Sequence, residues 1–238
     1  MVTLEVYRQV SDLPRVSYVV EGPTDYLVLD AIVGKFLKCD YVSTRIQPPL
    51  SEYADDQGPL GGGWRGVLSW CAKQGSLAGG LSQGGVLANC DYLVVHVDAD
   101  IARESDLLRF QLLDPDSPSN TCSNIRVHLA SLLSQPLPQQ VVLCAPAQAT
   151  EAWVFVALYT NDLPRYQPIE DRADVARLLI GRPGKLVRDK DGAARKQPRQ
   201  YENSLSRITA NWAKIVANCE EARHFDGRLR ELFAPATE

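Results

Sequence analysis

Acidic residues stand at the ends of two apolar segments of the chain. Glu21 closes the segment RVSYVVE (15–21), and Asp98 and Asp100 follow the segment YLVVHV (92–97). Residues two positions apart at an extended strand end can point the same way, so Asp98 and Asp100 can present two carboxylates to one hard cation. A bound Mg²⁺ or Mn²⁺ would polarise a phosphoryl oxygen and lower the pKa of a bound water. The pattern therefore predicts a metal site suited to phosphoryl chemistry.

Two further carboxylates can join this site. Asp25 falls in the first turn of the helix expected after Glu21, and Glu151 begins a later helix, where it either faces the same cleft or only favours the helix dipole. Carboxylates gathered without an interleaved Lys or Arg repel one another, so we expect a positive partner, most simply a divalent ion. His96 shares the direction of Asp98 along its strand and is either a core residue or a partner of that carboxylate.

The elements that would carry these residues alternate between strands and helices. Short β-branched segments predict the strands, and apolar residues at helical spacing predict the helices. Strands are expected at 15–21, 41–46, 92–97 and 140–144, and helices at 24–38, 64–74, 122–133 and 150–159, with 105–119 as a helix that runs into a loop. This order predicts an α/β fold with a parallel sheet flanked by helices, in which ligand sites lie beyond the carboxyl ends of the strands.

The last third of the chain has a different character. The segment 164–192 is rich in Pro, Gly and charge, so we place a boundary near Thr160, between a domain at 1–160 and a C-terminal extension at 161–238. The extension is expected to be helical, with one apolar stripe along 201–219 and a short last helix at 228–233.

Basic residues are concentrated within this extension. The chain carries a formal net charge of -4, yet seven Lys or Arg and two Asp lie between Arg182 and Arg199. The segment is either a solvated loop or a surface that contacts phosphates beside the acidic site. The candidate nucleic-acid contacts are Lys185, Arg188, Lys190, Arg195, Lys196 and Arg199.

The composition excludes several other classes of protein. Of the 238 residues, 45% are hydrophobic and 23% charged, as in an ordinary globular protein. No apolar segment approaches the roughly 20 residues that cross a bilayer, and no leader peptide is recognisable. The six cysteines form no CxxC pair, which argues against structural zinc and disulfides. We therefore expect a cytoplasmic protein that does not enter a membrane.

Two of these motifs have a familiar arrangement. A strand that ends in VVEGPTD before a helix, and a later strand that ends in VVHVDAD, resemble the Toprim domain of topoisomerases, primases and overcoming-lysogenization-defect nucleases. The resemblance covers residues 15–160 and implies a Toprim or Rossmann-like fold. It also implies that Glu21 acts as acid/base or metal ligand and that Asp98 and Asp100 hold the metal, while Asp25 matches an acidic position of the nuclease branch.

A third motif is similar to one in small Toprim-like proteins of bacterial anti-phage systems. The segment ATEAWVFVAL (149–158) carries an acidic residue followed by Ala-Trp, and its acidic residue is Glu151. The GGGWRGV insert near residue 60 departs from the Toprim pattern. An unusual or inactive branch of the Toprim-like proteins is therefore an alternative.

The resemblance implies a divalent-metal-dependent nuclease that acts on DNA or RNA, in phage defence or genome maintenance. One alternative is a non-catalytic Toprim-like subunit of a defence complex, which binds nucleic acid and works with a separate ATPase because this chain has no ATPase motif. A second alternative is a nucleotide-sugar transferase, whose DxD motif also follows a strand. All three functions are compatible with assembly of the chain as an oligomer.

Overall fold

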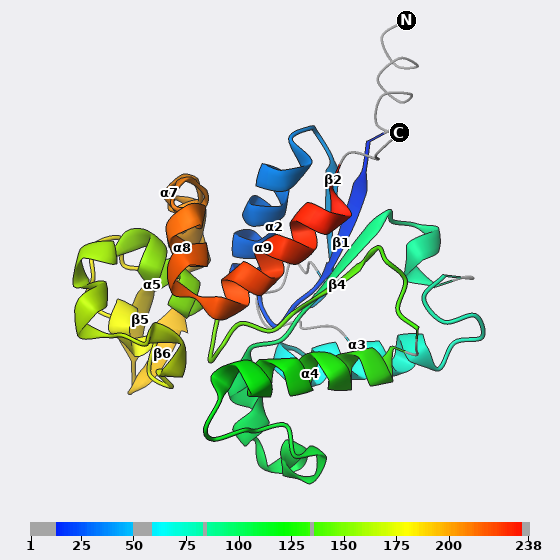
Figure 1. Ribbon diagram of the computed structural model, residues 1–238, viewed down its shortest axis with the longest axis horizontal. Coiled ribbons are helices and arrows are strands. Elements are labelled where there is room, and N and C mark those ends of the chain that lie inside the picture. Colours follow the sequence, from blue (N-terminus) through cyan, green and yellow to red (C-terminus); the bar gives the residue numbers. More distant parts are fainter. Residues whose placement is uncertain (1–12, 50–58, 83–84, 134–135, 235–238) are drawn as a thin grey trace, which may run out of the picture.

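The computed structural model describes residues 13–49, 59–82, 85–133 and 136–234. Its centre is a parallel four-stranded sheet in the order β2-β1-β3-β4, with helices on both faces (Figure 1). The sheet and its helices are β1 (Arg15–Val19), α2 (Pro23–Leu37), β2 (Val42–Gln47), α3 (Gly63–Gly75), β3 (Tyr92–His96), α4 (Pro118–Leu132), β4 (Val141–Cys144) and α5 (Glu151–Leu158). The predicted α/β fold class is confirmed.

The two central strands are buried on both faces. Alternate residues of a strand point to opposite faces, so Tyr18 and Val94 pack with α2 and α5, whereas Val19 and Val95 pack with α3 and α4. His96 follows the direction of Val94. It therefore points into the layer of helices that contains α2 and α5, where it lies close to Asp25 of α2 and to Thr150 before α5.

The C-terminal extension packs on the face of the sheet that α2 and α5 cover. Its helices are α6 (Pro198–Glu202), α7 (Leu205–Ala210), α8 (Trp212–Asn218) and α9 (Glu220–Leu232). The ring centroid of Trp153 in α5 lies 5.7 Å from that of Trp212 and 5.8 Å from that of Phe225. Buried aromatic rings contribute much of the apolar contact area of a core. The helices of the extension and the sheet therefore share one apolar layer.

Some helix boundaries differ from the sequence prediction. The expected stripe at 201–219 is divided among three short helices. Ser204 and Asn211 lie at the junctions, where their side chains hydrogen-bond the carbonyls of Gln200 and Arg207. In the segment 105–119, a 3-10 helix covers Ser105–Phe110, and α4 begins at Pro118, before the expected residue 122. The last helix starts at Glu220 instead of residue 228.

The basic segment forms a β-hairpin. Strands β5 (Val187–Lys190) and β6 (Ala193–Lys196) pair antiparallel, and the two loop residues, Asp191 and Gly192, both have positive φ. Such a loop matches the twist of the strands it joins. Short 3-10 helices precede β3 at Val86–Ala88 and follow it at Ala99–Arg103. Three more lie between α5 and β5, at Thr160–Arg165, Ile169–Asp171 and Arg177–Leu179.

Two sequence expectations concern the chain as a whole. No helix in the described part of the chain is long and apolar enough to cross a membrane. All six cysteines are free thiols, and only Cys39 is exposed. The expectations of no membrane span and no disulfide therefore agree with the described structure.

Glu170 connects the start of the extension to α9, its last helix. Its residue is 9% exposed, and its carboxylate accepts hydrogen bonds from the backbone N–H groups of Glu220 (2.6 Å) and Glu221 (3.3 Å). It thus caps the first turn of α9 from a distant segment. Burial nevertheless raises the pKa of Glu170 from 4.5 to about 7.

This raised pKa predicts a pH-dependent stability. The folded protein binds a proton at Glu170 more tightly than the unfolded chain does. The free energy of unfolding that this proton contributes is therefore complete below pH 4.5 and is lost as the pH rises through about 7. The variant Glu170→Gln removes the titration and keeps an acceptor. We expect its melting temperature relative to wild type to rise between about pH 5 and pH 8, by the equivalent of at most ~3 kcal/mol. A difference that stays constant with pH would contradict this account.

Candidate metal centre

The loops after β1, β3 and β4 meet at the carboxyl edge of the sheet. Glu21, two residues beyond β1, accepts a hydrogen bond at Oε1 from the backbone N–H of Asp98 (2.7 Å). The loop after β3 is also held by the loop after β4, because Ala99 donates its N–H to the carbonyl of Pro146 (3.0 Å). The sheet topology therefore brings segments from distant parts of the chain to one edge.

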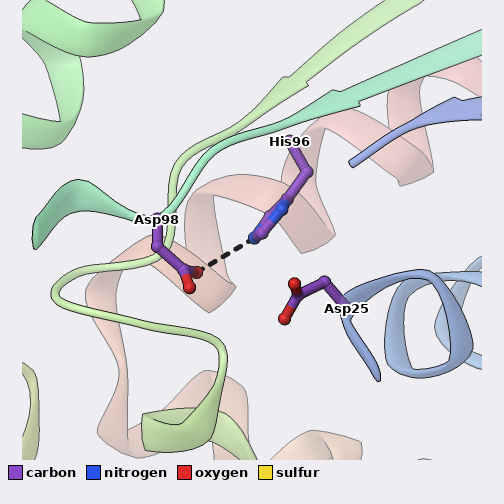
Figure 2. Close-up of side chains that lie close together, drawn as sticks. All are labelled: Asp25, His96 and Asp98. Atoms are coloured by element: carbon purple, nitrogen blue, oxygen red, sulfur yellow. Dashed lines mark hydrogen bonds and ion pairs between the residues drawn. The ribbon is translucent and has the colours of Figure 1, made fainter. Parts of the chain in front are cut away.

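Asp98 is fixed by three contacts to one of its oxygens. Its Oδ1 accepts hydrogen bonds from the backbone N–H (3.0 Å) and the hydroxyl (3.2 Å) of Thr150, and it lies 3.1 Å from Nε2 of His96. Figure 2 shows the His96 ring directed at this carboxylate. The other ring nitrogen, Nδ1, has no hydrogen-bond partner in the described part of the chain and is buried. Asp98 is therefore held rigidly, with His96 as its neighbour.

Asp25 completes a three-residue group. It lies in the first turn of α2, is 2% exposed, and faces the space between His96 and Asp98 (Figure 2). One ligand atom from each of Asp25, His96 and Asp98 lies within 4.8 Å of the others. Two carboxylates and an imidazole at this separation can hold a metal ion. We call Asp25, His96 and Asp98 the metal triad.

A lysine from the C-terminal extension enters the same site. Nζ of Lys196 in β6 lies 3.3 Å from Oδ1 of Asp25 and 2.9 Å from Oε1 of Glu151, and Tyr201 donates its hydroxyl to that same Glu151 oxygen (2.7 Å). Oε2 of Glu151 is buried without a hydrogen-bond partner among the described residues. Lys196 is therefore a positive partner of the carboxylates, in the role that the sequence analysis gave most simply to a divalent ion.

The carboxylates differ in their affinity for protons. Burial, together with the charges of Asp98 and Asp25, raises the pKa of Glu21 well above its usual value. Burial also raises the pKa of Glu151, although Lys196 opposes the shift. Burial alone would raise the pKa of Asp98, but the hydrogen bond from His96 and the charges of His96 and Lys196 bring it below the usual value.

The two basic groups respond in the opposite sense. Burial disfavours a charge on His96, yet the hydrogen bond to Asp98 and the charges of Asp98 and Asp25 raise its pKa. Burial likewise disfavours a charge on Lys196, but Asp25, Glu151 and Asp98 raise the pKa of its ammonium well above the usual value. The carboxylates therefore favour the positive form of both groups, and a metal ion at the triad would compete with that positive charge.

Asp100 lies at the rim of the site. The chain turns into a 3-10 helix at Ala99, so Asp100 leaves the extended direction of Asp98 and is exposed. Desolvation by the surrounding site and the charge of Asp98 raise the pKa of its carboxyl to about 7, although the residue itself contacts solvent. The structure therefore places Asp98 inside the site and Asp100 at its opening.

The candidate phosphate contacts fall into two sets. Lys196 points into the acidic site, whereas Lys185, Arg188, Lys190, Arg195 and Arg199 are exposed. Arg188 and Arg195 are directly paired across the hairpin and therefore project on the same face, opposite to the face of Lys196. The hairpin thus gives one cation to the site and keeps three on its outer face.

Sequence reasoning missed Thr150 and Tyr201, and it assigned Lys196 to a phosphate and not to the carboxylates that it contacts. Only the strand spacing of His96 signalled a partner of Asp98. No local pattern could assign Lys196 or Tyr201, because their contacts depend on how the extension packs against α2 and α5.

Comparison of the chain with protein-family models, with curated proteins and with solved structures gave no match.

The position of Lys196 predicts a large effect of its removal. In Lys196→Met the carboxylates of Asp25 and Glu151 lose their cation, and we expect the free energy of unfolding to fall by about 2–4 kcal/mol at neutral pH. Because a divalent ion can supply the missing charge, Mn²⁺ should raise the melting temperature of the variant more than that of wild type. Thermal unfolding with and without Mn²⁺ measures both effects.

Lys190 provides the matched control for this variant. It lies on the outer face of the same hairpin, is exposed, and makes no ion pair within the described ranges. The variant Lys190→Met should unfold at the wild-type temperature. Equal melting temperatures for Lys196→Met and Lys190→Met would show that Lys196 does not neutralise the site.

Proposed function

We propose that the chain is a divalent-metal-dependent phosphodiesterase that cleaves DNA or RNA, a nuclease of the Toprim-like kind. The observation that carries the proposal is the metal triad, Asp25, His96 and Asp98, whose ligand atoms converge at the carboxyl edge of a parallel sheet. An imidazole beside two carboxylates suits Mn²⁺ better than Mg²⁺, which prefers oxygen ligands and retains water. The proposed cofactor is therefore Mn²⁺, with Mg²⁺ as the alternative.

The residues around the triad have separate tasks in this proposal. A bound ion would supply charge to polarise a phosphoryl oxygen and to acidify a water. Glu21, whose pKa is raised by burial, suits the transfer of a proton to or from a reacting oxygen. Asp100, at the opening, would contribute a further carboxylate. Thr150 keeps Asp98 in place through its N–H and hydroxyl.

The outer face of the hairpin supports a nucleic-acid partner. Arg188 and Arg195 are paired across β5 and β6, where like charges destabilise a sheet, and neither forms an ion pair with a described carboxylate. A phosphate backbone would relieve this repulsion. Lys190 projects from the same face, with Lys185 and Arg199 close in sequence.

Lys196 favours a second candidate function. Its ammonium already neutralises Asp25 and Glu151, as expected of a site that has lost its metal. In that case the chain would be a non-catalytic Toprim-like subunit that binds nucleic acid in a phage-defence complex with an ATPase partner. Both candidates include a cytoplasmic location and allow assembly as an oligomer.

Cleavage assays with carboxylate variants test the proposal. We expect wild type to cleave single- or double-stranded DNA or RNA when Mn²⁺ or Mg²⁺ is present. Asp98→Asn and Asp100→Asn keep the size of the side chain and remove a charge, and each should lower the rate by at least about 100-fold. Asp100 is exposed, so its variant should fold as wild type.

The control variant is Asp40→Asn, because Asp40 is exposed and lies outside the site. It should cleave at the wild-type rate. Cleavage that persists in both Asp98→Asn and Asp100→Asn would exclude the metal site as its source. Nucleic-acid binding without cleavage would favour the non-catalytic subunit, and stabilisation by one sugar nucleotide alone would favour a nucleotide-sugar transferase.

A further inference from the structure

Arg103 stands beside the opening of the acidic site. It belongs to the 3-10 helix Ala99–Arg103, in which residues three apart lie on the same side, so Arg103 and Asp100 project together. Its guanidinium is exposed and donates a hydrogen bond from Nη1 to Oε1 of Gln148 (2.7 Å). A neutral amide therefore orients this guanidinium.

Gln148, the acceptor of this hydrogen bond, has a strained backbone conformation. It has a φ of +62°, in the left-handed region that residues with a Cβ avoid, and it is 6% exposed. Its carbonyl accepts the N–H of Asp100 (3.2 Å). Strained backbone of this kind persists where the surroundings fix it, and it is concentrated at functional sites. Gln148 thus connects Asp100 and Arg103 through its main chain and side chain.

Arg103 forms no close ion pair with a described carboxylate, whereas Arg65 lies 2.8 Å from Asp106. Its charge nevertheless acts on Asp100, where it opposes the rise in the pKa of that carboxyl. Arg103 and Gln148 line a cavity of about 160 Å³. Asp114, Asp116 and Asp171 also line this cavity, and Asp114 accepts hydrogen bonds from the side chain of Asn120 and the N–H of Asp116. Within the described part of the chain, four of the five guanidinium N–H donors of Arg103 have no partner and can bind a ligand.

We propose that Arg103, oriented by Gln148, forms a phosphate-binding subsite next to the metal triad. A planar guanidinium binds phosphate oxygens in pairs, which gives both affinity and orientation. The assignment of this phosphate to the substrate backbone rests on the proposed nuclease function. The subsite would hold a phosphate beside Asp100, at the opening through which a substrate must enter.

Binding of inorganic phosphate and pyrophosphate, measured by calorimetry in the presence of Mg²⁺, tests the subsite directly. Arg103→Met should weaken binding by about 10- to 100-fold, the loss expected for a hydrogen bond to a charged group. Arg103→Lys keeps the charge but not the paired donors, and it should lie between Arg103→Met and wild type. Arg109→Met is the control, because Arg109 is exposed and lies over the Phe110 ring, 4.7 Å from its centroid.

The variant Gln148→Gly separates binding from folding. Glycine adopts positive φ without strain, so the variant should unfold at or near the wild-type temperature. It removes the amide that orients Arg103, and phosphate binding should weaken. Weaker binding only in proportion to a loss of folded protein would overturn the role of Gln148.

The outcomes also distinguish the subsite from the nuclease. Phosphate binding that Arg103→Met weakens, in a protein that cleaves no nucleic acid, would support the subsite and reject the nuclease. Cleavage with an unchanged KM in Arg103→Met would reject the subsite and retain the nuclease. Wild type that binds neither phosphate nor pyrophosphate, or variants with equal affinity, would overturn the proposal.

Discussion

The site depends on one electrostatic constraint: buried carboxylates at the carboxyl edge of the sheet need a positive charge among them. Asp25, Asp98 and Glu151 are each less than a tenth exposed, and removing such groups from water is costly unless they are protonated or paired. The protein meets this demand with the ammonium of Lys196, with the hydrogen bond between His96 and Asp98, and by raising the pKa of Glu21 and Glu151. A metal ion would meet the same demand, so the ion, the protons and the ammonium are alternatives.

This constraint explains why the C-terminal extension is part of the site. The extension supplies Lys196 and Tyr201, both of which contact Glu151, while its aromatic residues Trp212 and Phe225 pack on Trp153 in α5. The apolar contacts therefore fix the position from which the hairpin presents Lys196. A change in this packing would move Lys196 and thereby alter the charge of the acidic site.

The sequence predicted much of the fold and the location of the site, but not its internal pairing. Strand ends at Glu21 and Asp98 could be read from apolar segments, because parallel strands bring such ends to one edge. The turn at Ala99 was not foreseen, since Asp100 was expected to continue the extended direction of Asp98. The role of Lys196 could not be predicted either. It depends on the hairpin register and on packing between segments about 170 residues apart, which no local pattern records.

A crystal of the protein soaked in Mn²⁺ and measured for anomalous scattering tests the central claim most directly. We predict one strong peak in contact with Asp25, His96 and Asp98, with the ammonium of Lys196 displaced from Asp25. A site without a peak, in which Lys196 still bridges Asp25 and Glu151 at saturating Mn²⁺, would contradict the account and leave the lysine as the permanent cation of the site.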